Sequence, residues 1–358
     1  MKTIICPLDW GFGHATRIIP IIKHCVELGH EVWLGSSGNS ERLLKEEFPN
    51  LNHIHLPNYK AKYSRFNSQI LAILVQLPFF LFSLIREHFL IKHFVKKHHF
   101  ELIISDNRYT VRNKKAYNVF ISHQLNVIFP RYIKVIGILF NFLQHKLIEK
   151  FDEVWLPDEK TGLNISGVLS NTTRNQDKTY VIGLLSRFKI ASPTETAKKK
   201  YDLLIILSGP EPQRSLLEKK LFQQLANSNL NILLIRGTFR PLEIKPSSFE
   251  ICSYMDTKTL EQTINLSNLV LCRAGYSSIM DLIRLQKQAI LIPTPGQTEQ
   301  EHLGRWLMKR NFFYSINQDS MRIDRDIHKA WNYHPPLEPY NQVLEKRIHK
   351  IGKFISRR

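Results

Sequence analysis

A histidine in a glycine-rich loop near the start of the chain is the first residue whose type and position suit chemistry. Gly11, Phe12 and Gly13 precede His14, and helix-spaced apolar residues follow it. Glycines let backbone amides approach a ligand and a helix N-terminus favours an anion, so the loop is a candidate acceptor or phosphate site. His14 is a candidate general base or phosphate ligand, and the alternative is a helix-capping histidine without a catalytic task. Thr16 replaces the third glycine of the dinucleotide fingerprint, which argues against a nicotinamide enzyme.

Polar side chains follow two later apolar runs that are typical of strands. Asp106, Asn107 and Arg108 come after one run, and His123 and Gln124 come after the next. Because the carboxyl ends of parallel strands meet at one edge of a sheet, we expect these side chains near the glycine loop. Asp106 is the candidate acid partner that orients the loop histidine as a base. The other four are candidates for binding the acceptor or a phosphate.

The second half of the chain carries residues suited to a nucleotide and a sugar. Ser208 and Gly209 end an apolar run and start a helix, which suits a phosphate, with a plain turn as the alternative. A later glycine turn presents backbone amides and polar side chains from Arg273, Gly275, Ser277 and Ser278. Asp281, on the helix that follows, can accept two hydrogen bonds from a ribose diol. The loop after the next strand supplies groups suited to sugar hydroxyls, on Gln297, Gln300 and Glu301.

The stretch from Cys272 to His302 resembles the nucleotide-binding signature of the MurG-like transferases, family 28 of the GT-B glycosyltransferases. In that family an acidic residue, often Glu, holds the nucleotide ribose at the place of Asp281. The resemblance also assigns contacts with the donor sugar to Gln300 and Glu301. The N-terminal glycine loop and Ser208-Gly209-Pro210 are similar to the two other glycine loops of the family. It implies an inverting, metal-independent transfer from a UDP-sugar, with the leaving diphosphate stabilised by helix N-termini.

Two departures from the family pattern bear on the acceptor. The N-terminal loop has one glycine fewer than the GGTGGH pattern, and Gly304 stands where the family has an asparagine. We therefore expect a relative of MurG with another acceptor, a lipid-linked or glycan molecule of cell-envelope glycan assembly.

The elements that must position these residues form two series of alternating strands and helices. The expected strands of the first series are Thr3–Leu8, Glu31–Gly35, Glu101–Ser105, Asn118–Ser122 and Glu153–Pro157. Those of the second are Tyr201–Leu207, Ile232–Arg236, Phe249–Tyr254, Leu269–Cys272 and Gln288–Pro293. Such alternation predicts an α/β protein of the GT-B class, with two Rossmann-like doubly wound domains facing a cleft. We place the acceptor domain at 1–165, a linker at 166–200, the donor domain at 201–330 and a helical tail at 331–358.

The charge is strongly positive and unevenly distributed. The net charge is +19, and residues 58–150 hold 15 Lys and Arg against 4 Asp and Glu. Such a surface attracts phosphate on lipids, nucleotides or nucleic acids, and the alternative is a merely solvated basic face. The apolar stretch Ile70–Ile85 contains Pro78 and is shorter than a membrane span, so we expect a buried or membrane-touching helix.

The remaining patterns bear on cofactors and location. The four cysteines have neither CxxC nor metal-ligand spacing, and the first apolar run reads as a strand rather than a signal peptide. We therefore expect a cytoplasmic protein, peripheral on the inner face of the membrane. Asp324-Arg325-Asp326 is the one Asp-x-Asp motif and lies in a polar stretch, so neither a metal nor another cofactor is expected.

Three functions are compatible with these patterns. The leading one is transfer of a hexose or N-acetylhexosamine from a UDP-sugar to the acceptor described above. The second is a MurG-like hydrolase, in which His14 activates water against the UDP-sugar. The third is a non-enzymatic protein that binds membranes or nucleic acid through its basic surface. No RNA- or DNA-binding motif is present, so nucleic acid is not an expected partner.

Overall fold

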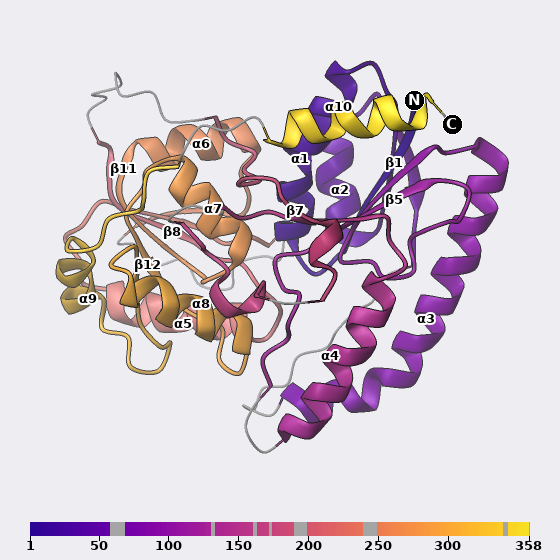
Figure 1. The fold of residues 1–358 in the computed structure, drawn as a ribbon. Helices are drawn as coiled ribbons and strands as arrows, with labels where there is room; N and C mark the ends of the chain where they lie inside the picture. Colours follow the sequence, from indigo (N-terminus) through magenta and orange to yellow (C-terminus); the bar gives the residue numbers. More distant parts are fainter. Residues whose placement is uncertain are drawn as a thin grey trace. The chain divides into compact units, whose positions relative to one another are not determined.

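The computed structural model describes residues 1–57, 69–129, 133–159, 163–171, 174–189, 199–238, 249–338 and 343–357, with side chains for all of these except 69–78 and 80–81. The chain divides into two compact units (Figure 1). The first comprises Met1–Ala61, Ile73–Leu185 and Pro339–Arg358, and Ser186–Glu338 makes up most of the second.

The first unit is built on a seven-stranded parallel sheet. Its strands are β1 (Lys2–Pro7), β2 (Glu31–Ser36), β3 (Asn52–His55), β4 (Leu102–Asp106), β5 (Tyr117–Ile121), β6 (Glu153–Leu156) and β7 (Thr179–Val181). Their order across the sheet is β3-β2-β1-β4-β5-β6-β7. The central strands are continuous apolar runs because helices cover both faces of a parallel sheet.

Helices α1 (Phe12–Glu27), α2 (Gly38–Glu47), α3 (Gln69–His98), α4 (Lys134–Ile148) and α10 (Val343–Ile355) belong to the same unit, with short 3-10 turns at Gly167–Leu169 and Gln176–Lys178. In α1, Ile18, Ile22 and Cys25 recur at helical spacing and are fully buried. Gly29 takes a positive φ of 75° directly after this helix, as the sequence pattern predicts.

The second unit repeats the plan with six parallel strands. They are β8 (Tyr201–Ile206), β9 (Ile232–Ile235), β10 (Glu250–Cys252), β11 (Ser267–Cys272), β12 (Ala289–Leu291) and β13 (Tyr314–Ser315), in the order β10-β9-β8-β11-β12-β13. Its helices are α5 (Gln213–Leu225), α6 (Thr257–Asn265), α7 (Tyr276–Arg284), α8 (Thr298–Lys309) and α9 (Ile323–Ala330). The core of this unit includes Leu203, Leu221, Leu234 and Leu271.

Each sheet has a switch point, where successive connections leave in opposite directions. It lies between β1 and β4 in the first unit and between β8 and β11 in the second. Ligands of doubly wound sheets bind outside the carboxyl ends of the strands at such points. The predicted residues His14 and Asp106 follow or end the first pair of strands, and Gly209 and Gly275 follow the second pair.

The limits of the first unit differ from the domain limits expected from the sequence. Strand β7 lies inside the expected linker and pairs with β6, Thr179 opposite Val154, so the unit extends to Leu185. The expected tail also returns to this unit, because α10 packs beside α1 and Arg347 forms a bidentate ion pair with Glu153. Strands β3, β7 and β13 were not predicted because they are short and only partly buried, so they lack the continuous apolar run that marks short strands such as β9 and β12.

Candidate functional site

The loop between β1 and α1 places a histidine at the switch point of the first sheet. Gly11 has a φ of 89°, a conformation that side chains rarely adopt, and the helix begins at the next residue. His14 therefore lies in the first turn of α1, with 14% of its side chain exposed. Asp9 fixes the other end of the loop by accepting a hydrogen bond from the amide of Ser40, 3.0 Å away.

The two predicted catalytic residues are in contact. Asp106 is fully buried at the end of β4, and its Oδ2 lies 3.0 Å from Nδ1 of His14. Arg17, one helical turn after the histidine, forms a bidentate ion pair with the same carboxylate, with Nε 2.9 Å from Oδ2 and Nη2 bonded to Oδ1. Sequence reasoning missed Arg17 because it sits among the apolar residues of α1.

Arg17 also reaches the second predicted histidine. Its Nη1 lies 2.8 Å from Nδ1 of His123, which follows β5 and is 5% exposed. A guanidinium can only donate, so Nδ1 of His123 must accept, and the proton of that ring resides on Nε2. Residues from α1, β4 and the loop after β5 thus form one buried network.

Burial and charge set the protonation states of this network. Burial lowers the pKa of His14, Arg17 lowers it further, and Asp106 offsets these effects only in part. Burial alone would raise the pKa of Asp106, but Arg17 and His14 hold it well below its usual range. At neutral pH the carboxylate is therefore ionised and His14 is neutral, which is the state that a general base requires.

The other residues predicted at this edge serve the fold. Asn107 has a positive φ of 55°, and the chain turns so that Arg108 points into the unit. Arg108 donates to the carbonyl oxygen of Pro7 at 2.8 Å and pairs with the buried Glu87 of α3. The carbonyl oxygen of Gln124 accepts a hydrogen bond from a side chain of α4. These contacts give no support to a phosphate-binding role for Arg108.

In the second unit the switch-point loops lie close together. Gly209 has a φ of 97°, and a Cβ at this position would lie 3.9 Å from Oγ1 of Thr294 in the loop after β12. Gly275 is the N-cap of α7, and the hydroxyl of Ser278 lies equally close to its Cβ position. The structure thus brings the predicted residues Ser208, Gly209, Gly275, Ser277 and Ser278 to the carboxyl edge of the sheet.

Buried polar atoms without a hydrogen-bond partner gather at this same edge. Within the described residues they include Oγ1 of Thr294, Oε1 of Gln213, Oε1 of Gln297 and Nε of Arg273. Arg273 also donates to the carbonyl oxygens of Gln213, Ile292 and Pro293, so its guanidinium ties the start of α5 to the loop after β12. Buried polar atoms are normally paired, so this cluster indicates a place where a polar ligand binds.

Gln300 and Glu301 hold the loop that precedes α8. Oε1 of Gln300 accepts from the amide of Thr294 at 2.9 Å, and Oε1 of Glu301 accepts from the amide of Gly296 at 3.0 Å. One oxygen of each predicted sugar-binding residue is therefore used to shape the loop. Glu211 precedes the N-cap of α5 and accepts from the amide of Ser215, so a phosphate at this helix start would meet a negative charge.

Asp281 lies on α7 with 14% of its side chain exposed. Its Oδ1 accepts a hydrogen bond from the hydroxyl of Ser186 at 2.6 Å, and Nε of Arg187 lies 3.9 Å from Oδ2. Burial raises the pKa of this carboxyl to about 6, because Arg187 and Ser186 offset the loss of water only in part. Ser186 and Arg187 were not predicted, since they stand in the expected linker.

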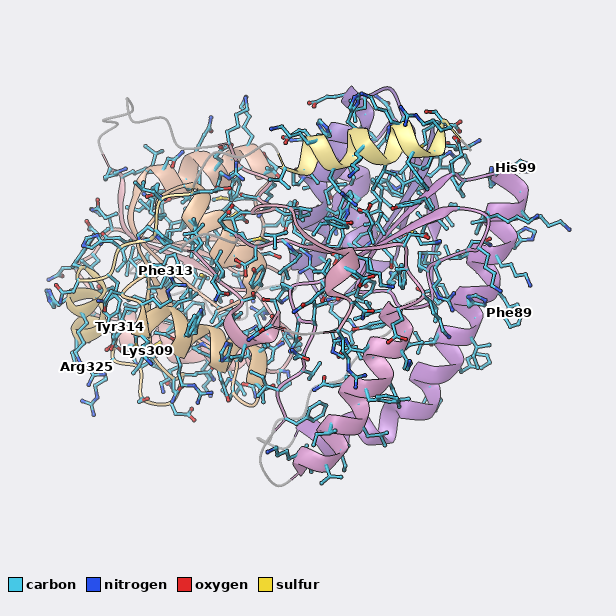
Figure 2. All side chains as sticks on the ribbon, viewed as in Figure 1. Phe89, His99, Lys309, Phe313, Tyr314 and Arg325 are labelled. Carbon is cyan, nitrogen blue, oxygen red and sulfur yellow. The ribbon has the colours of Figure 1, made fainter. Side chains whose placement is uncertain are left out.

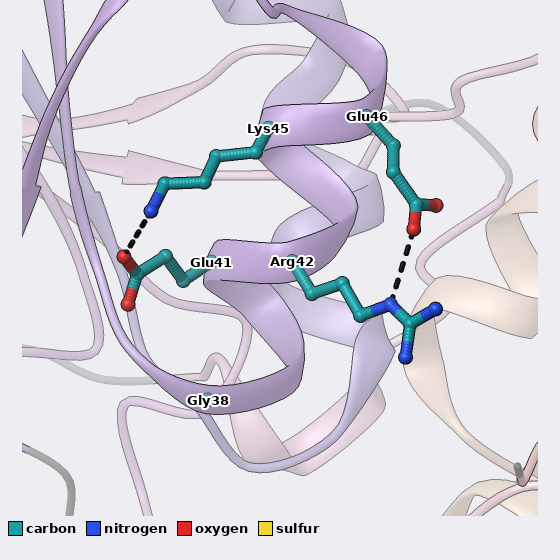
Figure 3. Close-up of a pocket in the computed structure, with 5 residues that line it drawn as sticks. All are labelled: Gly38, Glu41, Arg42, Lys45 and Glu46. Atoms are coloured by element: carbon teal, nitrogen blue, oxygen red, sulfur yellow. Dashed lines mark hydrogen bonds and ion pairs between the residues drawn. The ribbon is translucent and has the colours of Figure 1, made fainter.

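Other features lie apart from these two edges. A shallow hollow of about 390 Å³ beside α2 is lined by ion pairs between Glu41 and Lys45 and between Arg42 and Glu46 (Figure 3). The described residues contain no group of three or more side chains arranged to hold a metal ion. Asp326, of the Asp-x-Asp motif, is buried and accepts from Tyr314 and from the amide of Arg322.

Helices α3 and α4 of the first unit expose an unusual number of apolar side chains. Both extend beyond the sheet toward the bottom of Figure 1, and Phe89 points outward from α3 (Figure 2). The exposed apolar residues of the two helices are Phe79, Phe82, Ile85, Phe89, Val135, Ile136, Ile138, Leu139, Phe140, Phe142 and Leu143. We call them the apolar face. Across the described residues, no helix combines the length and apolar character that crossing a membrane requires.

Comparison with known proteins finds sequence similarity to glycosyltransferases. Residues 209–316 match the sequence model of the glycosyltransferase family 28 C-terminal domain. A protein of Methanosarcina mazei, described as an uncharacterized glycosyltransferase, is 21% identical over 316 residues, which cover 84% of this chain and 82% of that protein.

Solved structures share the arrangement at low sequence identity. A spinosyn rhamnosyltransferase complexed with thymidine diphosphate superposes with a TM-score of 0.61 at 12% identity, over 100% of this chain and 96% of that one. MurG of Acinetobacter baumannii gives 0.58 at 14% identity, over 98% and 99%. These likenesses confirm the predicted GT-B fold.

Proposed function

We propose that this chain, a MurG-like glycosyltransferase of the GT-B fold, transfers a hexose or N-acetylhexosamine from a UDP-sugar to a lipid-linked or glycan acceptor of cell-envelope assembly. The observation that carries the donor part is the cluster of unpartnered buried atoms at the carboxyl edge of the second sheet. Oγ1 of Thr294 and Nε of Arg273 can donate to a phosphate, and Oε1 of Gln213 and Oε1 of Gln297 can accept from sugar hydroxyls. Asp281 offers two oxygens to a ribose diol. A structural neighbour is complexed with thymidine diphosphate, which is also a pyrimidine nucleoside diphosphate, and this supports a nucleoside diphosphate sugar as the donor.

The first unit supplies the base in this proposal. With Nδ1 of His14 held by Asp106, Nε2 takes the proton of the acceptor hydroxyl. The acceptor oxygen forms its bond to the anomeric carbon as the bond from that carbon to the diphosphate breaks, and UDP leaves with the electron pair. A single displacement inverts the anomeric centre, and the proton transfer contributes roughly 10²–10⁴-fold to the rate. Backbone amides at the glycine loops meet the developing charge, so the step needs no metal or other cofactor.

The apolar face supports a lipid-linked acceptor at an anionic membrane surface. Glu87 is the one acidic residue within α3 and α4, and it is buried against Arg108. The exposed cations of these helices include Arg86, Lys92, Lys96, Lys134 and Lys146. Large apolar patches rimmed by cations are typical of surfaces that bind anionic lipid. We therefore propose that the protein binds peripherally at the inner face of the membrane.

Nucleotide titration tests the donor site. Calorimetry with UDP, GDP, CDP and TDP should give selective micromolar binding of UDP, and Asp281→Ala should abolish it. Incubation with UDP-sugars and no acceptor then separates two reactions on the same site. If free sugar is released without acceptor as fast as sugar is transferred in its presence, the protein is a hydrolase and not a transferase. Absence of binding to all four nucleotides would contradict both.

Flotation with vesicles tests the membrane part separately. The wild type should float with phosphatidylglycerol vesicles at low salt and not with phosphatidylcholine vesicles. A Leu139→Gln/Leu143→Gln variant should lose flotation, whereas Leu216→Gln, on an exposed apolar residue of the second unit, should not. Concentration-dependent dimerisation of the wild type without flotation would show that the apolar face binds a second copy instead.

A further inference from the structure

The buried Arg17 has no role in the transfer step described above, although it contacts every titratable group around His14. We propose that Arg17 is a positioning residue that fixes Asp106 and His123 and keeps the imidazole of His14 in the neutral form that removes a proton. This inference rests on the proposed function in one respect, which is that His14 acts as the base.

The contacts of Arg17 exclude a direct role with substrate. Its side chain is 2% exposed, and all three guanidinium nitrogens are used within the unit. Nε and Nη2 bind the two oxygens of Asp106, Nη1 binds His123, and Nη2 also lies 2.9 Å from Nδ1 of His14. No other standard side chain presents donors in this forked geometry, so a lysine can replace the charge but not the three contacts together.

The charge of Arg17 is needed because a carboxylate and a histidine alone would form a poor base. A buried carboxylate 3.0 Å from an imidazole stabilises the imidazolium, and a histidine protonated at neutral pH cannot accept a further proton. Arg17 compensates the carboxylate directly, with Nε on the same Oδ2 that faces His14 and Nη2 on Oδ1, so its positive charge opposes the effect of Asp106 at His14. Asp106 can then orient the ring without holding it in the charged form.

Two competing hydrogen bonds at Nδ1 of His14 decide which ring nitrogen carries the proton. If Nδ1 carries the proton it donates to Asp106, and Nε2 is left as the base. If Nδ1 is bare it accepts from Nη2 of Arg17, and Nε2 is blocked by its own proton. The groups that face His14 are Arg17 on α1, Asp106 at the end of β4 and His123 after β5. Because the Nδ1 proton donates to the ionised Asp106, and a hydrogen bond to a charged acceptor is the stronger one, we expect the base-competent tautomer to be the more populated one.

Three variants separate this role from simple support of the fold. Arg17→Gln leaves Asp106 uncompensated and should shift the acidic limb of the kcat/KM profile upward by roughly 1–3 pH units. Activity should fall at neutral pH and recover as the pH rises. Arg17→Lys should leave the acidic limb of the profile near its wild-type pH and lower the plateau value of kcat/KM. Arg17→Gln/Asp106→Asn, which removes both charges, should bring the limb back down and guards against misfolding of the single variant.

A direct readout makes the test independent of turnover. The His14 resonance in spectra of histidine-labelled protein, assigned by its absence in His14→Gln, should titrate at higher pH in Arg17→Gln than in the wild type. An unchanged titration, or a kinetic profile reduced in height without a shift, would overturn the proposal. If the titration shifts while His14→Gln transfers sugar at the wild-type rate, the electrostatic role stands and the assignment of His14 as base fails.

Discussion

The two units each hold a carboxylate near the switch point of their sheet, and the two carboxylates differ in how their charge is compensated. Asp106 is fully buried and paired at both oxygens with Arg17, and its pKa is held well below the usual range. Asp281 keeps 14% of its side chain exposed, and its nearest cation, Arg187, is 3.9 Å away. Burial raises its pKa to about 6.

The difference lies in the placement of a guanidinium and not in the depth of burial alone. A carboxylate compensated within the fold stabilises the fold and orients its neighbours. A carboxylate left partly uncompensated costs folding free energy that ligand hydroxyls can offset when they bind. We therefore interpret Asp106 as a charge that positions its neighbours and Asp281 as a charge that binds ligand. Substitution by asparagine should lower the free energy of unfolding at Asp106 and raise it at Asp281.

Asp106→Asn should have the largest effect on stability. It leaves the guanidinium of Arg17 buried without its counter-charge, which costs about 3–5 kcal/mol. Urea unfolding followed by circular dichroism measures this loss, and Asp324→Asn on an exposed site serves as the control. The stability that Asp106 contributes is present above roughly pH 4 and is lost as the pH falls toward its depressed folded-state pKa. If Asp106→Asn unfolds at the same urea concentration as the wild type, Asp106 is not a charge compensated within the fold.

Asp281→Asn should weaken UDP binding by roughly 10–100-fold, because the amide keeps one acceptor oxygen and loses one hydrogen bond to a charged acceptor, worth about 1.5–3 kcal/mol. Calorimetry measures the change, with the exposed Asp319→Asn as the matched control. Ser186→Ala should bind UDP at least as tightly as the wild type, because it removes the hydroxyl that occupies Asp281 in the free protein. Wild-type affinity in Asp281→Asn would show that the ribose is held elsewhere.

The sequence was sufficient to predict the residues at each switch point but not the partners that decide their charge. The apolar runs predicted ten strands, and the position after a strand predicted that His14 and Asp106 meet. Arg17 is separated from Asp106 by 89 residues, so only the folded chain shows that a charge among apolar helix positions is paired. Ser186 and Arg187 were not predicted for the same reason, since Asp281, which they contact, lies far along the chain on α7.

Arg108 shows the opposite failure. Its place after β4 predicted a side chain directed to the ligand edge, but the left-handed conformation of Asn107 turns the chain so that Arg108 binds Glu87. The alternation of side chains along a strand predicts the face on which each one lies. That prediction no longer holds after a residue in the left-handed conformation has turned the chain. The apolar stretch Ile70–Ile85 was predicted as a helix, and α3 confirms the helix, although the side chains of 69–78 and 80–81 lie outside the described part of the chain.

In the absence of ligand, Asp281→Asn should stabilise the second unit by roughly 1–2 kcal/mol at pH 7.5. The pKa of about 6 means that the folded protein holds this proton up to about pH 6, whereas the unfolded chain releases it near 3.8, the ordinary pKa of an aspartate. The folded state therefore binds more protons between these values, and stability falls as the pH rises from about 4 to about 6. The amide carries no charge and removes this loss. A lower midpoint for unfolding in urea would contradict the interpretation of Asp281 as uncompensated.

The smallest effect is the pH dependence of donor binding, which follows from the same raised pKa. Only the ionised carboxylate of Asp281 accepts two hydrogen bonds from the ribose, so affinity should fall below pH 6 and be about tenfold weaker at pH 5 than at pH 8. The terminal phosphate of UDP also titrates near pH 6, so the titration is better done with UDP-N-acetylglucosamine, whose diphosphate has no proton to gain in this range. Asp281→Asn provides the control, since any slope that survives in it belongs to other groups. A wild-type affinity that stays level from pH 8 to pH 5 would mean that Asp281 binds the ribose without titrating, and would place its charge compensation closer to that of Asp106.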